Sequence, residues 1–226
     1  MASPSMAPTV WFKDKKPAAL IEMSLVSLFI ITWALLPVPS TVIPVLFIAM
    51  LSLWLRSKRW RDMGLFVPKN WLMVAVIGII IGIVATAINI GVVTPFLIKI
   101  SGAAIGLSSV AFIKGNIFNF VVALVFIWMF AAVAEEMVYR GYVLNRITDM
   151  AGQNSCGYAV AITIGAILFG IAHARLDIAS MAGIFLAGTF NGLLYIANKR
   201  NLLLPIIVHG TMDSIVLILL FLGMLF

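Results

Sequence analysis

Seven apolar stretches dominate this chain and limit what it can fold into. A helix needs about 20 mostly apolar residues to cross the hydrocarbon core of a bilayer, and it satisfies its backbone hydrogen bonds internally. The stretches therefore predict an all-α, polytopic transmembrane helix bundle with about seven spans. The expected spans are residues 17–36, 39–55, 71–98, 117–139, 156–173, 179–197 and 202–226.

The composition supports this class and excludes others. Hydrophobic residues make up 63% of the chain, whereas a soluble domain contains about half. Cys156 is the one cysteine, so no internal disulfide can form. The net charge is +7, but the basic residues lie at the ends of the apolar stretches and form no continuous stripe. We therefore expect the lipid bilayer, and no nucleic acid, as a partner.

The basic residues also predict an orientation and a division of the chain. With the N-terminus in the cytoplasm, twelve of the fifteen Lys and Arg lie on the inner side, and Lys99, Lys114 and Arg175 lie outside. The positive-inside rule thus favours a cytoplasmic N-terminus and an outer C-terminus, as in a bacterial inner membrane. Residues 100–116 are Gly- and Ser-rich and should form an outer loop or a shallow surface helix.

Ionisable residues in or beside these stretches require an explanation, because a charge at the bilayer centre costs about 2.5–3.5 kcal/mol. They include the only two histidines of the chain, and two pairs are four residues apart and share a helix face. Two carboxyl groups and two imidazoles can together activate a water, which helix packing does not require. The full set is Glu22, Glu135, Glu136, Arg140, His173, His209 and Asp213.

Each of these residues also has a structural interpretation. The two pairs can be plain intramembrane ion or hydrogen-bond pairs, and His173 can be a helix-packing histidine. Phe169 stands one turn before His173 and can wall the same face. Glu22 lies near the start of the first stretch, where its carboxylate can extend toward the headgroups, so we expect it to be structural.

Three short motifs carry a resemblance to a known family. "EEMVYR" at 135–140 fits Glu-Glu-x-x-x-Arg, "FGIAH" at 169–173 fits Phe-x-x-x-His, and "HGTMD" at 209–213 fits His-x-x-x-Asn/Asp. In this order they resemble the CPBP intramembrane proteases, also called Abi, which include type II CAAX prenyl endopeptidases and bacterial proteins linked to bacteriocin self-immunity. The resemblance covers about residues 117–220. It implies peptide-bond hydrolysis in a cavity within the membrane, with a protease core at 117–226 behind N-terminal helices and a linker at 1–116.

The resemblance also implies roles for individual residues. Glu135 matches the general base, and His173 helps to hold and activate the water. His209 faces the substrate carbonyl, where an N–H donor can stabilise an oxyanion. Arg140 holds Glu136 and can also take a carboxylate of the substrate through its planar fork.

Asp213 departs from the prenyl-protease pattern, which has Asn at this position. An amide can donate a hydrogen bond to an oxyanion, and an ionised carboxylate cannot. Asp213 therefore orients His209, acts as a neutral acid, or binds a metal. For the last case, Glu135, His173, His209 and Asp213 are ligand types that Zn²⁺ accepts, although no H-E-x-x-H helix is present. We favour a glutamate-activated water and leave zinc open.

These observations predict an intramembrane endopeptidase. Its substrate stays open among a CAAX-type peptide, a bacteriocin-like peptide and a membrane protein. Two other classes compete: a non-catalytic membrane scaffold or immunity factor, and a proton-coupled carrier, for which an inverted repeat would be expected and none is found. One difficulty is depth. His209 lies about 10 Å from Leu202 at 1.5 Å per residue, so its helix must start deep in the membrane or the cavity must open inward.

Overall fold

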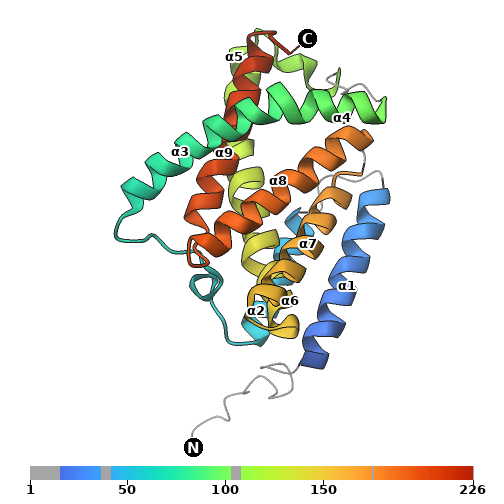
Figure 1. The fold of residues 1–226 in the computed structure, drawn as a ribbon, viewed down its shortest axis with the longest axis vertical. Helices are drawn as coiled ribbons and strands as arrows, with labels where there is room; N and C mark the ends of the chain where they lie inside the picture. The colour runs from blue at the N-terminus through green and yellow to red at the C-terminus, as the bar shows by residue number, and fades with distance from the viewer. Residues whose placement is uncertain (1–15, 37–41, 103–107, 175, 226) are drawn as a thin grey trace, which may run out of the picture.

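The computed structural model describes residues 16–36, 42–102, 108–174 and 176–225, and these residues form a bundle of helices without strands (Figure 1). Two apolar helices in this part of the chain are shorter than a full span, Val42–Leu55 (α2) and Ser155–Ile171 (α7). Five are long enough to cross a membrane: Lys16–Leu35 (α1), Trp71–Ser101, Ile117–Ala151, Ile178–Ala197 (α8) and Leu203–Phe221 (α9). Together they follow the seven predicted stretches in order, which confirms the all-α transmembrane bundle.

The two longest helices are composite rods with wider π-helical turns. The first joins α3 (Trp71–Ile88), η3 (Asn89–Val93) and α4 (Thr94–Ser101). The second joins α5 (Ile117–Phe126), η5 (Ile127–Glu135), η6 (Met137–Leu144) and α6 (Asn145–Ala151), and we call it the central rod. π-Helical turns occur frequently at functional sites. In the central rod they flank Glu136, within the first predicted motif.

Local sequence explains where the helices near the site begin and end. The side chain of Asn116 accepts a hydrogen bond from Asn119 N at the start of α5, and Asp177 does the same for Ser180 N at the start of α8. Such side-chain caps satisfy backbone N–H groups that lack a partner within the helix. The central rod ends at Gly152, whose φ of 100° a residue with a side chain rarely adopts.

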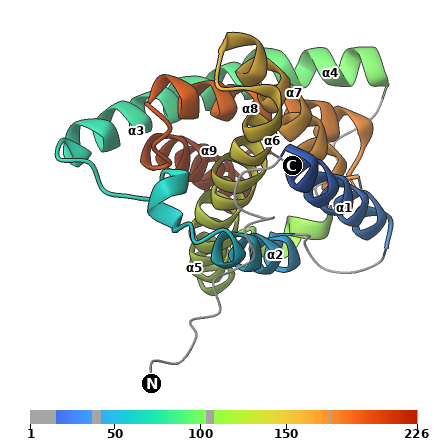
Figure 2. The same cartoon turned by 90° about the horizontal axis from the view of Figure 1, so that it is seen from below.

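The central rod stands in the middle of the bundle. Figure 2 shows α3 and α9 on one side of it and α1 on the other. The helix α3 approaches α9 closely through Gly78 and Gly82, where an added Cβ would lie 2.8 Å from Ile207 Cγ2 and 2.7 Å from Thr211 Cβ. Small residues four apart allow membrane helices to pack tightly. This contact fixes the position of α9, which carries the third motif.

The start of α9 sets the height of His209 relative to the central rod. Its helix begins after Leu202, whose backbone N–H donates to Gly64 O at 2.9 Å. In Figure 1 the first turn of α9 lies well above the lower ends of α1 and α6. The helix therefore starts above those ends, and His209 Nδ1 comes within 2.9 Å of Glu136 Oε1.

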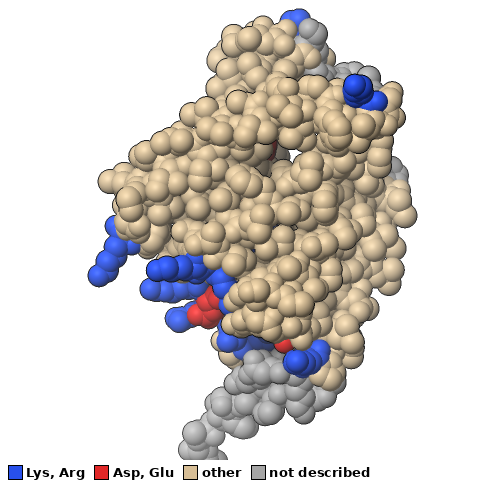
Figure 3. Space-filling view, viewed as in Figure 1, with Lys and Arg blue, Asp and Glu red and all other residues tan. Residues whose placement is uncertain are grey.

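Charged side chains gather at one end of the molecule. Figure 3 shows Lys and Arg grouped at the lower end, an uncharged surface above them, and basic side chains again near the top. We call the lower end the basic end, and it includes Lys16, Arg56, Arg146 and Arg200. At the opposite end, Lys114 lies beside Gly223 after α9. The segment predicted as a loop or shallow helix contains a 3₁₀ helix, Ser108–Ile113 (η4), while residues 103–107 and Arg175 are outside the described residues.

Candidate active site

A cavity inside the bundle brings the three motifs together. It has a volume of about 200 Å³ and lies between the central rod, the end of α7, α8 and α9. Four of the six predicted site residues line it, namely Glu135, His173, His209 and Asp213. The other six lining residues include Phe169 from α7 and Asn191 from α8.

Glu135 and His173 face each other across this cavity. Their nearest atoms, Glu135 Oε1 and His173 Nε2, are 4.0 Å apart, which is too long for a direct hydrogen bond. His173 Nδ1 lies 2.9 Å from Phe169 O. A carbonyl can only accept, so Nδ1 carries the proton and Nε2 of the neutral ring is the free acceptor. Both the carboxylate and this nitrogen thus present acceptor atoms to the space between them.

Glu136 is fully buried and joins three elements. Its Oε1 accepts hydrogen bonds from Arg140 Nη1 at 2.8 Å and from Asn191 Nδ2 at 3.0 Å, and lies 2.9 Å from His209 Nδ1. The predicted Glu136–Arg140 pair is therefore present. A buried carboxylate is tolerated when a charge partner and further donors surround it. The second glutamate of the first motif thereby holds the histidine of the third motif.

Arg140 makes its contacts with the protein itself. Besides Glu136, its Nη2 donates to Gly188 O at 3.0 Å, and its guanidinium carbon lies 4.9 Å from the centre of the Phe169 ring. The side chain is 3% exposed, and it does not line the cavity. The geometry supports the role of holding Glu136 and does not place the guanidinium where a substrate carboxylate would lie.

His209 and Asp213 form the i,i+4 pair expected on α9. His209 Nε2 lies 3.4 Å from Asp213 Oδ2, and Asp213 is the more exposed of the two. The Phe169 ring stands edge-on to both imidazoles, with its centre 5.1 Å from that of His173 and 6.3 Å from that of His209. Phe169 therefore walls the site as predicted, and it separates the two histidines.

Asn191 is a site residue that the motifs did not reveal. It lies on α8, is 3% exposed, and lines the cavity while donating to Glu136. Its buried Oδ1 has no hydrogen-bond partner among the described residues. The available signal was a carboxamide inside an apolar helix, in "TFNGLL". Such a group is costly in a membrane unless it is hydrogen-bonded.

The proposed metal ligands lie in two pairs rather than in one cluster. Glu135 faces His173, and His209 faces Asp213, around the same cavity. Among the described residues, no three His, Cys, Asp or Glu side chains are close enough together to hold a metal ion in this arrangement. Zinc would need three such ligands at about 2 Å. The four side chains in this arrangement therefore do not fit a zinc site.

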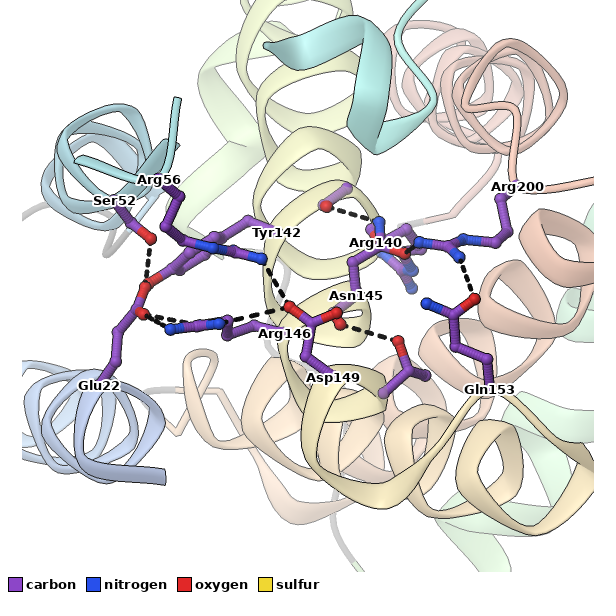
Figure 4. Close-up of polar contacts among 12 residues, drawn as sticks. Glu22, Ser52, Arg56, Arg140, Tyr142, Asn145, Arg146, Asp149, Gln153 and Arg200 are labelled. Atoms are coloured by element: carbon purple, nitrogen blue, oxygen red, sulfur yellow. Dashed lines mark hydrogen bonds and ion pairs between the residues drawn. The ribbon is translucent and has the colours of Figure 1, made fainter. Parts of the chain in front are cut away.

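Glu22 lies among the polar side chains of the basic end (Figure 4) and does not line the cavity. Its Oε1 accepts from Tyr142 Oη and its Oε2 from Arg146 Nε, both at 2.6 Å. Glu22 thus has partners on the central rod, which supports the expected structural role. The prediction missed these contacts because both partners come from the central rod, far along the chain. Ser52, Arg56 and Asp149 complete the network, which ties α1 and α2 to the rod.

Comparison with known proteins finds one family model that matches part of the chain. Residues 117–215 match the family model described as Type II CAAX prenyl endopeptidase Rce1-like. This range contains all three motifs and every described residue that lines the cavity. No curated protein and no solved structure matches the chain.

Proposed function

Residues 117–215 match the type II CAAX prenyl endopeptidase Rce1-like family model, and on this premise we propose that the chain is a member of this family and an intramembrane endopeptidase. The observation that carries the proposal is the 4.0 Å separation of Glu135 Oε1 and His173 Nε2 in a cavity within the bundle. This separation suits a bridging water, which can lie about 2.8 Å from each atom.

Glu135 is the general base in this mechanism. It takes one proton from the bridging water while the water oxygen attacks the carbonyl carbon of the peptide bond. His173 Nε2 accepts the other hydrogen of the water and so fixes its orientation. The Phe169 carbonyl supports this by holding the proton on His173 Nδ1.

His209 is the donor that we assign to the tetrahedral oxyanion. In the protonated ring, Nδ1–H donates to Glu136, and Nε2–H points toward Asp213 and the cavity. A donor fixed before the reaction stabilises the charge that develops on the carbonyl oxygen. Asp213 orients the ring from its outer side, a role that an ionised carboxylate can fill.

The cycle closes when the intermediate collapses. The carbon–nitrogen bond breaks, and Glu135 returns its proton to the leaving nitrogen. The products are a new carboxyl terminus and a new amino terminus, and Glu135 is again a carboxylate. Arg140 and Asn191 act through Glu136, and we assign them as positioning residues.

The substrate we propose is a peptide or protein segment at the membrane, and the classes to compare are a CAAX-type peptide, a bacteriocin-like peptide and a membrane protein. We place the protein in a bacterial inner membrane with its N-terminus in the cytoplasm. The grouping of Lys and Arg at one end of the molecule supports this orientation under the positive-inside rule (Figure 3).

A comparison of peptide termini tests the proposal. Membranes that contain the wild type are compared with membranes that contain Glu135→Ala, after chemical labelling of new amino termini. Asp62→Asn, which removes a charge at a distant exposed pair, serves as the control. We expect termini that appear with the wild type and Asp62→Asn and are missing with Glu135→Ala. Identical termini in all three samples would contradict endopeptidase activity.

A further inference from the structure

A second cavity adjoins the catalytic one. It has a volume of about 310 Å³ and shares Ile184, Ala187, Met212 and Asp213 with the catalytic cavity. We call it the entrance cleft. Its other lining residues include four with hydroxyl or amide groups, which are Thr86, Asn89, Thr94 and Ser180.

The entrance cleft lies toward the end of the molecule opposite to the basic end. Its walls are the α3–η3–α4 rod and the start of α8, where Leu176 and Ser180 line it. The other end of α8 leads to Arg200, which contacts Gln153 at the basic end. Figure 3 shows a hollow in the uncharged upper surface, with acidic atoms visible inside it.

A layer of buried polar contacts lies between the site and the basic end. Asn145 Nδ2 lies 2.7 Å from Tyr195 Oη, and Tyr195 Oη donates to Met63 O at 2.9 Å. Asn145 also accepts from Arg200. Asn145 and Tyr195 are at most 2% exposed, and the neighbouring Leu202 is fully buried. This layer separates Glu136 from the basic end of the bundle.

We propose that the entrance cleft delivers an extended peptide segment to Glu135 and His173 from the membrane side opposite to the basic end. The inference rests on the proposed function, because it names the form and the side of that enzyme's substrate. With the N-terminus in the cytoplasm, this is the outer side.

The chemistry of the cleft favours an extended segment. Unwound backbone in a membrane needs hydrogen-bond partners. The hydroxyl groups of Thr86, Thr94 and Ser180 donate within the protein, but their oxygens can still accept from a backbone N–H. Two other cavities, of about 480 and 460 Å³, reach Asp213 and Met212 respectively. Their linings are almost entirely apolar, so they provide few hydrogen-bond partners for a peptide backbone.

Cysteine labelling tests the side from which the cleft opens. Asn89→Cys is made in a Cys156→Ser background and treated with a membrane-impermeant maleimide, in intact cells and in inverted vesicles. Native Cys156, which is exposed near Gln153 at the start of α7, reports the basic end in the wild type. Val92→Cys is the matched control, because Val92 lies in the same π-helical turn, is 63% exposed, and lines none of the described cavities.

We expect Asn89→Cys to react only from the side where Cys156 does not react, and Val92→Cys to remain unlabelled in the lipid. Labelling of Asn89→Cys from the side of Cys156, or from neither side, would overturn the proposal. The same labelling in a Glu135→Gln variant does not require activity. If Asn89→Cys is labelled from the expected side but the protein cleaves no peptide, the proposed function is rejected. The aqueous opening of the cleft on that side is then still supported.

Filling the cleft tests whether the substrate passes through it. An added Cβ at Gly183 would meet only Leu97 Cδ1 at 3.7 Å, and one at Gly91 would meet nothing within 4 Å. Gly183 lines the cleft and Gly91 does not, so Gly183→Phe and Gly91→Phe form a matched pair. We expect cleavage to fall at least tenfold in folded Gly183→Phe and to stay within twofold in Gly91→Phe. Equal cleavage by both folded variants would contradict the route.

Discussion

His209 Nδ1 lies 2.9 Å from Glu136 Oε1, although the two residues belong to different helices and are separated by most of the protease-like core. This contact joins the first motif to the third. It also gives the two adjacent glutamates different tasks. Glu136 accepts hydrogen bonds from Arg140 and Asn191, whereas Glu135 faces the cavity and His173.

The buried hub at Glu136 predicts a loss of both stability and activity in Glu136→Gln. The neutral amide leaves the Arg140 guanidinium without its charge partner, and breaking a buried ion pair costs roughly 3–5 kcal/mol. Thermal unfolding in detergent measures the stability. In Asp62→Asn, whose partner Arg59 is exposed, the change should stay below about 1 kcal/mol. Equal unfolding temperatures for Glu136→Gln and the wild type would show that the pair has no structural role.

Asn191 should affect turnover through Glu136 and His209. Asn191→Leu keeps the approximate volume and removes the donor to Glu136 Oε1, a charge-assisted hydrogen bond worth about 1.5–3 kcal/mol. We expect kcat to fall about 10- to 100-fold while KM changes little, because Asn191 positions the catalytic groups. Asn191→Gln, which retains an amide, should recover part of the rate. A change confined to KM would instead place Asn191 in substrate binding.

Asp213 separates the two candidate chemistries. If Asp213 orients His209, then Asp213→Asn should keep at least a tenth of the wild-type rate, because the amide matches its size and can still contact the ring. Dialysis against a strong chelator should then leave wild-type cleavage unchanged. A stoichiometric metal in the wild type that is lost in Asp213→Asn, with activity restored by added Zn²⁺, would replace the water mechanism drawn above.

The helices and the three motifs could be predicted because their signals are local. Apolar length predicts a span wherever it occurs, and Glu136 with Arg140 share a helix face by spacing alone. The sequence also predicted the wall formed by Phe169, because that residue stands one turn before His173. These features depend on one helix at a time.

Contacts between helices could not be predicted in the same way. The bond from His209 to Glu136 depends on the rotation of α9 against the central rod, which the glycines of α3 help to set. The depth of His209 depends on the contact between Leu202 and Gly64. Asn191 and Glu22 contact polar side chains of the central rod. From the sequence alone, many other polar side chains were equally good candidates for these contacts.

Glu135→Gln tests the central claim most directly. The amide keeps the shape of the side chain but cannot take a proton from water, and general-base catalysis contributes about 10²–10⁴-fold to a rate. Cleavage of a peptide found in the terminus comparison would be measured with purified wild type, Glu135→Gln and Asp62→Asn, alongside their unfolding temperatures. The account predicts an unfolding temperature close to that of the wild type and a rate at least about 100-fold lower in Glu135→Gln alone. Cleavage at the wild-type rate by folded Glu135→Gln would contradict the account.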